Sequence, residues 1–146
     1  MRKNIKTTAV LLCLLLFVLP SCSPQPRYPA PPRSGNDVMI DIAALRPEVP
    51  EFYTYRHRTR NINFFVIAVN KKVFSFLDAC VSCYPKRLGY RYDKGYVVCR
   101  ACDVSYSVYK LDRGIGGCYP IRIAGRVEKG RYLIPLSTLE GMADKF

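Results

Sequence analysis

The alternation of apolar and polar positions predicts a domain built mainly from strands. Residues 63–69 (NFFVIAV) are rich in β-formers, and residues 73–77 (VFSFL) alternate as a half-buried strand does. Turn-forming residues at 70–72 separate the two runs. The pattern therefore predicts a hairpin whose second strand leads into the first of a series of cysteines.

A second hairpin is expected at residues 89–99. Residues 89–92 (GYRY) and 96–99 (YVVC) flank Asp93-Lys94-Gly95, where Gly95 can take a positive φ. Short strands are also predicted at the segments 38–42, 51–60, 121–123 and 131–134, the last two joined through residues 128–130. Residues 104–111 fit a short helix or a strand equally well.

The chain is expected to end in a short helix over residues 138–145, capped by Ser137. Glu140 follows that serine by three residues, as in a capping box. The fold class predicted from these patterns is mostly β (α+β), a small hairpin-rich domain with a short C-terminal helix.

The first 22 residues predict a lipoprotein signal peptide. A basic start with Arg2, Lys3 and Lys6 precedes an apolar run over residues 7–19, which is too short for a membrane span. Cys22 directly follows the break at Ser21, so we expect it to be lipidated and to hold the protein on a membrane. An ordinary cleaved signal or an uncleaved anchor helix remains the alternative. Residues 23–36 contain five prolines and predict an extended tether, which leaves 37–146 as the folded domain.

Charge narrows the choice of partners. The chain carries a formal net charge of +12, to which the three basic residues of the signal contribute. A basic surface favours anionic lipids or polysaccharides. Nucleic acid is not expected as a partner, because the chain is predicted to be exported and its basic residues are scattered.

Five of the seven cysteines lie within 39 residues, and they carry the clearest chemical signal. Cys13 falls in the signal and Cys22 at the lipidation site. Cys80-x-x-Cys83 and Cys99-x-x-Cys102 are two C-x2-C pairs separated by 15 residues. Each pair predicts a zinc-ribbon-like knuckle that turns two sulfurs to one side, and two knuckles at the ends of a hairpin can converge on zinc or an iron centre. Two disulfides, or a redox-active pair, remain alternatives in an exported protein.

Other candidate residues are fewer. Cys118 follows the glycines at 114, 116 and 117, which permit a close backbone approach, so it is either a fifth ligand or a buried structural cysteine. His57 is the only histidine, and it lies in a basic stretch typical of a surface. The tyrosines are expected to pack in the sheets rather than to relay electrons; they are Tyr90, Tyr92, Tyr96, Tyr106 and Tyr109.

The ordered motifs resemble a known family. Residues 77–84 (LDACVSCY), 98–102 (VCRAC) and 116–121 (GGCYPI) are similar to the signature of the FtrD-like domain, which is described as a membrane iron–sulfur protein domain. The resemblance covers residues 37–146 and implies a role in envelope iron transport or electron transfer. It also implies five cluster ligands, namely Cys80, Cys83, Cys99, Cys102 and Cys118. Relatives often carry transmembrane helices before this domain. Given the predicted lipoprotein signal, this chain is expected to be a lipoprotein form without those helices.

The expected function is that of a non-catalytic envelope protein with a thiolate metal centre. Arg2-Lys3 is not a twin-arginine signal, so the chain is expected to cross the membrane unfolded and to acquire its metal outside, where zinc or Cu(I) competes with iron–sulfur. The alternative is a structural-zinc adaptor that binds a partner protein or an anionic surface. One histidine and sparse acids argue against an enzyme, and no catalytic residue is assigned. Ser23 after Cys22 favours the outer membrane in a two-membrane cell, where metal-transport or redox proteins would be its partners.

Overall fold

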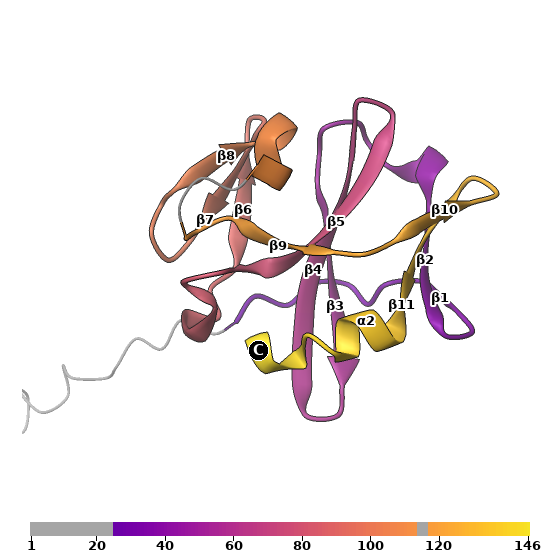
Figure 1. Ribbon diagram of the computed structural model, residues 1–146, viewed down its shortest axis with the longest axis horizontal. Coiled ribbons are helices and arrows are strands. Elements are labelled where there is room, and N and C mark those ends of the chain that lie inside the picture. Colours follow the sequence, from indigo (N-terminus) through magenta and orange to yellow (C-terminus); the bar gives the residue numbers. More distant parts are fainter. Residues whose placement is uncertain (1–24, 114–116) are drawn as a thin grey trace, which may run out of the picture.

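The computed structural model describes residues 25–113 and 117–146, which form three antiparallel sheets (Figure 1). The first sheet has the order β1-β2-β11-β10, the central sheet β3-β4-β5-β9, and the third β6-β7-β8. The strands are β1 (Arg33–Ser34), β2 (Asp37–Asp41), β3 (Glu51–His57), β4 (Arg60–Val69), β5 (Lys72–Cys80), β6 (Tyr90–Asp93), β7 (Tyr96–Cys99), β8 (Ser105–Ser107), β9 (Pro120–Ile123), β10 (Arg126–Glu128) and β11 (Arg131–Pro135). The predicted class, mostly β with one short C-terminal helix, is confirmed.

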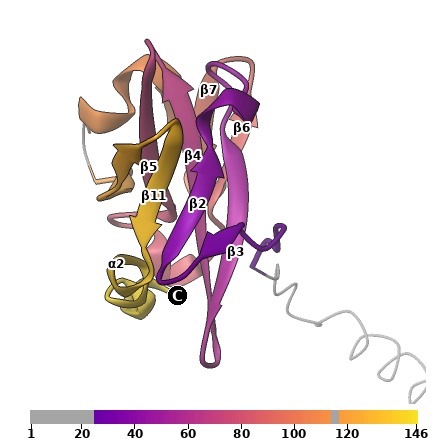
Figure 2. The same cartoon turned by 90° about the vertical axis from the view of Figure 1, so that its right-hand side faces the viewer.

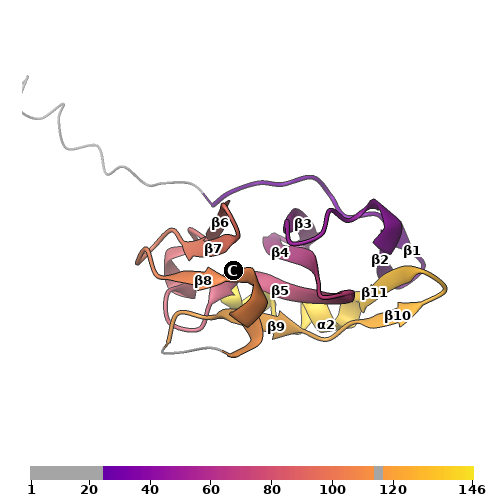
Figure 3. The same cartoon turned by 90° about the horizontal axis from the view of Figure 1, so that it is seen from above.

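The central sheet lies between the other two, so both of its faces are buried (Figure 3). Side chains alternate between the faces of a strand. In β4, Ile62, Phe64 and Val66 enter one core, whereas Phe65 and Ile67 enter the other. This double burial explains why residues 63–69 show no polar alternation.

The first core lies between the central sheet and the sheet that contains β2 and β11. Val38 and Ile40 of β2 and Ile134 of β11 are buried there, and β2 and β11 pair side by side in register (Figure 2). Leu139 from the C-terminal helix closes the same core. No cysteine belongs to this core among the described residues.

The second core lies between the central sheet and β6-β7-β8, and it contains the cysteines. Phe76 and Cys80 of β5 face Tyr90 of β6 and Cys99 of β7 across this layer. Stacked aromatic rings of Phe65 and Phe76 fill its centre, with centroids 5.4 Å apart. The metal-binding candidates therefore sit at the edge of an apolar layer rather than in a loop remote from the core.

The hairpins form largely where they were expected. Lys94 and Gly95 connect β6 and β7, with Gly95 at φ +87°, and Asn70 and Lys71 take positive φ in the turn between β4 and β5. Residues 104–111, which fitted two conformations, contain both: β8 and then the 3-10 helix Val108–Arg113. The two strands predicted at 121–123 and 131–134 do not pair, because β9 joins the central sheet and β10 pairs with β11 instead.

The C-terminal helix begins earlier than predicted. α2 spans Leu136–Glu140, and a separate 3-10 helix covers Ala143–Lys145. Ser137 lies inside α2, and its side chain makes no capping hydrogen bond. The residue at the N-cap is Pro135, which has no capping side chain. The predicted cap was therefore wrong. The helix starts at Leu136, because burial of the Leu136 side chain in the first core stabilises a helix that begins there.

The described part of the predicted tether lies on the domain instead of extending away from it. The Pro26 and Pro29 carbonyls accept hydrogen bonds from Asn63 Nδ2 and the Thr54 amide at 2.6 and 3.0 Å. Tyr28 donates its backbone N–H to Thr54 Oγ1, and its ring packs 5.0 Å from that of Phe52. Prolines keep this segment extended, but their carbonyls remain free to pair with an edge strand, which here is β3. Residues 1–24, including the predicted signal peptide, Cys13 and Cys22, lie outside the described residues.

Candidate metal centre

The cysteines come together because β5 and β7 end, and β9 begins, at the same edge of the second core. Cys80 is the last residue of β5 and Cys99 the last residue of β7. Cys99 pairs with Tyr90 in β6, and Cys80 pairs with Pro120 in β9. The second pairing places the loop that carries Cys118 beside the first knuckle.

Local hydrogen bonds form each knuckle. In the first, the Cys83 backbone N–H donates to Cys80 Sγ at 2.8 Å. In the second, the Asp103 N–H donates to the Cys99 carbonyl at 2.9 Å, and Asp103 takes φ +57°. A short polar residue tolerates this left-handed conformation, so the turn closes without a glycine.

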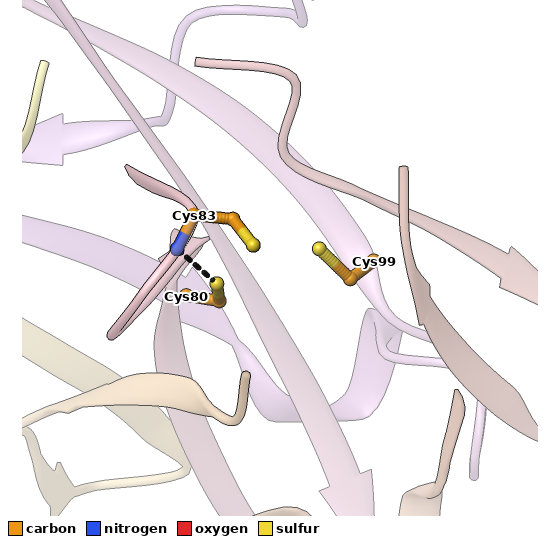
Figure 4. Close-up of side chains that lie close together, drawn as sticks. All are labelled: Cys80, Cys83 and Cys99. Carbon is orange, nitrogen blue, oxygen red and sulfur yellow. Dashed lines mark hydrogen bonds between the residues drawn. The ribbon is translucent and has the colours of Figure 1, made fainter. Parts of the chain in front are cut away.

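The five sulfurs form two groups of three that share Cys83. In one group Cys80, Cys83 and Cys99 have sulfurs within 4.8 Å of one another. Figure 4 shows these three side chains close together. In the other, Cys83 and Cys102 join Cys118, whose sulfur lies 3.5 Å from that of Cys83 and 3.1 Å from that of Cys102. The structure thus brings together all five predicted ligands, with Cys118 in direct contact with both knuckles.

Burial divides the two groups. Cys80 and Cys99 are each only 2% exposed, whereas Cys102 is exposed and Cys118 is partly exposed. Burial raises the pKa of the Cys99 thiol to about 12. The backbone N–H of Val104 lowers the pKa of Cys102 from its ordinary value, and hydrogen bonding to Cys102 raises that of Cys118. In the metal-free protein Cys102, which is exposed, therefore ionises more readily than the buried Cys99.

Asp78 anchors the third sheet to the central one, and the sequence analysis did not identify it. Its Oδ1 accepts from the Tyr90 backbone N–H and its Oδ2 from the Tyr28 hydroxyl at 3.1 Å. A Cβ on Gly89 would lie 2.2 Å from Asp78 Oδ2, so only glycine permits this approach. The available signal was an acidic residue inside the apolar run Phe76-Leu77-Asp78-Ala79, two positions before Cys80.

Tyr90 connects this anchor to the loop of Cys118. The Tyr90 hydroxyl donates to the Cys118 carbonyl at 2.8 Å, and the Tyr90 carbonyl accepts from Arg100 Nε at 2.9 Å. Tyr90 itself is fully buried. One tyrosine thus fixes the loop of the fifth cysteine relative to both knuckles.

The other sequence candidates lie apart from the sulfurs. His57 Nδ1 lies 3.2 Å from Glu140 Oε1, and neither sulfur group contains a histidine. Of the five tyrosines, Tyr90 and Tyr106 are buried in the second core, as expected for sheet packing. Tyr96 and Tyr109 are about half exposed, so the packing prediction was wrong for these two.

The donor set fits a thiolate-held metal. Every described side chain in the two groups offers sulfur, and thiolates favour zinc, Cu(I) or iron–sulfur clusters over harder cations. An iron–sulfur cluster uses four cysteines, and these five exceed that number. The same residues would therefore suit zinc or an iron–sulfur cluster, and the donor set does not select between them.

Comparison with known proteins supplies one match. A family model described as "Membrane iron-sulfur containing protein FtrD-like" matches residues 45–146. No curated protein matched the chain. In the part of the chain that the structure describes, no helix has the length and apolar character needed to span a bilayer.

Proposed function

The chain belongs to the family of FtrD-like membrane iron–sulfur proteins, and from this membership we propose that it is a lipid-anchored, non-catalytic metal protein of the cell envelope. Its centre is held by Cys80, Cys83, Cys99, Cys102 and Cys118. It serves iron transport or electron transfer outside the cytoplasm, together with metal-transport or redox proteins of the envelope.

The single observation that carries this proposal is the convergence of the five sulfurs from five separate points of the chain. Two strand ends, two turns and a loop contribute the sulfurs of the two groups, and within each group the sulfurs lie within 4.8 Å of one another. Unpaired thiols that are crowded together gain only weak hydrogen bonds from their contact, whereas binding of deprotonated thiols to a cation adds to the free energy of folding. A metal centre explains the crowding.

The exposed end of the cluster supports exchange with a partner. Cys102 reaches the surface, and three basic side chains next to the knuckles in the sequence are also exposed: Lys86 and Arg87 after the first knuckle, and Arg100 within the second. An exposed edge allows electrons or a metal ion to pass without opening the core. Basic residues around it favour the approach of an acidic partner surface.

The second candidate is a structural-zinc adaptor. Cys80 and Cys99 are buried and connect the central sheet to the third sheet, so a metal there would hold the two layers together. In that case the surface, rather than the metal, would carry the function.

Metal analysis of the protein purified anaerobically from membranes tests both candidates. Iron with acid-labile sulfide and a visible band bleached by dithionite is the expected result for electron transfer. One zinc ion and a colourless protein would favour the adaptor. Metal-free protein with all five thiols oxidised would refute the metal centre.

Lipidation at Cys22 has a separate test. Mass spectrometry of the N-terminal peptide should find acyl chains on Cys22, and Cys22→Ala should release the protein from membranes. Membrane attachment that survives Cys22→Ala would contradict the anchor.

A further inference from the structure

The arrangement of the sulfurs specifies how many ions the centre holds. The two groups, Cys80/Cys83/Cys99 and Cys83/Cys102/Cys118, share only Cys83. We propose that the centre binds a pair of thiophilic cations, one in each group, bridged by the sulfur of Cys83. This inference rests on the proposed metal centre and adds its nuclearity and its bridging ligand.

Sulfur separations support two neighbouring ions. Around one tetrahedral ion with metal–sulfur bonds of about 2.3 Å, the sulfurs lie roughly 3.8 Å apart. Cys118 Sγ lies 3.5 Å from Cys83 Sγ and 3.1 Å from Cys102 Sγ, so a small expansion of the outer group suffices. The inner group has its sulfurs within 4.8 Å of one another, which a small contraction accommodates.

Cys83 is placed to bridge. It lies at the end of the first knuckle, where its own N–H holds Cys80 Sγ at 2.8 Å and its sulfur faces Cys118. A thiolate has three lone pairs, so it can donate to two cations at once. The other four cysteines each belong to one group and act as terminal ligands.

Charge also favours two ions over one. Five thiolates around one divalent cation would leave three negative charges uncompensated in a cluster that includes the buried sulfurs of Cys80 and Cys99. Uncompensated charge is costly in such a layer. Two divalent cations balance all but one of the five charges.

The two bound ions should differ in how readily they exchange with ions in solution. The inner ion is held by Cys80 and Cys99, each 2% exposed, whereas the outer ion is held by the exposed Cys102 and the partly exposed Cys118. The inner ion then fastens the sheets together, and the outer ion is the one that a chelator or a partner can reach. One centre would in this way combine structural and exchangeable metal.

Cobalt(II) is the probe that tests this inference, because it replaces zinc, gives thiolate charge-transfer absorption and is paramagnetic. The full exported chain, stripped of metal and reduced under argon, is titrated with Co(II) alone. The absorption should rise to an end point at two ions per chain. The electron paramagnetic resonance signal should grow with the first ion and fall with the second, because a bridging sulfur couples the two spins.

Variants assign the ions to the groups. Cys99→Ser and Cys118→Ser should each bind one Co(II) with an uncoupled signal, and Cys83→Ser should abolish coupling and weaken both ions at least tenfold. Ser105→Ala, on the exposed edge of β8, is the control and should retain two coupled ions. The signal of the unaltered protein decides the question even where a variant fails to fold.

Four results overturn the inference. An end point at one ion leaves the proposed metal centre intact but refutes the pair. Two ions with undiminished paramagnetic signal refute the bridge. Native protein with sulfide equal to iron would make sulfide the bridging atom and Cys83 a terminal ligand, again with the proposed function intact. Failure to bind any metal refutes both proposals.

Discussion

Asp78 offers a sharp test of how the third sheet is held to the central one. Its carboxylate is 2% exposed and accepts hydrogen bonds from the Tyr90 amide and the Tyr28 hydroxyl. Burial raises the pKa of Asp78 from 3.8 to about 7, against the opposing effect of these hydrogen bonds and of Arg100. Asp78→Asn removes the ionisation while keeping the shape and one acceptor oxygen. Asp78→Ala removes the acceptors as well.

The raised pKa fixes the sign of the pH dependence. Between pH 3.8 and about 7 the folded state keeps a proton that the unfolded state has released, so the free energy of unfolding falls as pH rises. The stabilisation that comes from the raised pKa of Asp78 is fully present below pH 3.8 and is lost above about pH 7. A shift of about 3 pKa units corresponds to about 4 kcal/mol.

Urea unfolding of metal-free, reduced protein at several pH values between 4 and 8 measures this contribution of Asp78 to the free energy of unfolding. From pH 4 to pH 8 the free energy of unfolding of the wild type should fall by about 4 kcal/mol relative to that of Asp78→Asn. His57 and the surface carboxyls are present in both proteins, so their titration cancels in the difference. At pH 7 Asp78→Ala should be about 1–3 kcal/mol less stable than Asp78→Asn, because the buried Tyr90 N–H loses its acceptor.

A difference between wild type and Asp78→Asn that stays constant with pH would refute this reasoning. It would mean that Asp78 is ionised in the folded state throughout, and that its hydrogen bonds and Arg100 compensate fully for burial. Equal stabilities of the Asn and Ala variants would remove Asp78 as the anchor of β6.

Further predictions concern the same region. Gly89→Ala should cost more than about 3 kcal/mol in thermal or urea unfolding, because the new Cβ meets Asp78 at a φ of +67°. Gly95→Ala, at φ +87° with nothing within 4 Å, should cost only about 1 kcal/mol, and equal costs would contradict the close approach. Removing metal should speed amide hydrogen exchange in β6–β8 but leave the amides of β2, β4 and β11 protected, because the first core contains no described cysteine. Uniform loss of protection would show that the two cores unfold as one cooperative unit. Metal affinity, measured by competition with a chromophoric chelator, should rise between pH 6 and pH 8, because binding must displace protons from the cysteines, among them Cys99, whose pKa burial raises to about 12. A flat profile would mean that binding displaces no thiol proton.

Local patterns in the sequence were sufficient for much of the fold. Residues 63–69 and 73–77 predicted β4 and β5, and Asp93-Lys94-Gly95 predicted the β6–β7 turn, because strand alternation and positive φ depend on neighbouring residues alone. The spacing of two C-x2-C pairs predicted both knuckles for the same reason. The helix start at Leu136 was missed, since it is set by burial against strands far along the chain.

The sequence by itself determined the elements and the chemistry of the donors: mainly strands, five sulfurs in order, and the family signature around them. Only the tertiary structure decided which sulfurs meet. The pairing of Cys80 with Pro120 brings Cys118 beside Cys83, although 35 residues separate the two cysteines. It also decided that Asp78 holds β6 and that residues 25–36 lie on the domain. These contacts depend on strand order and sheet stacking, which arise from long-range burial and leave no periodic trace in the sequence.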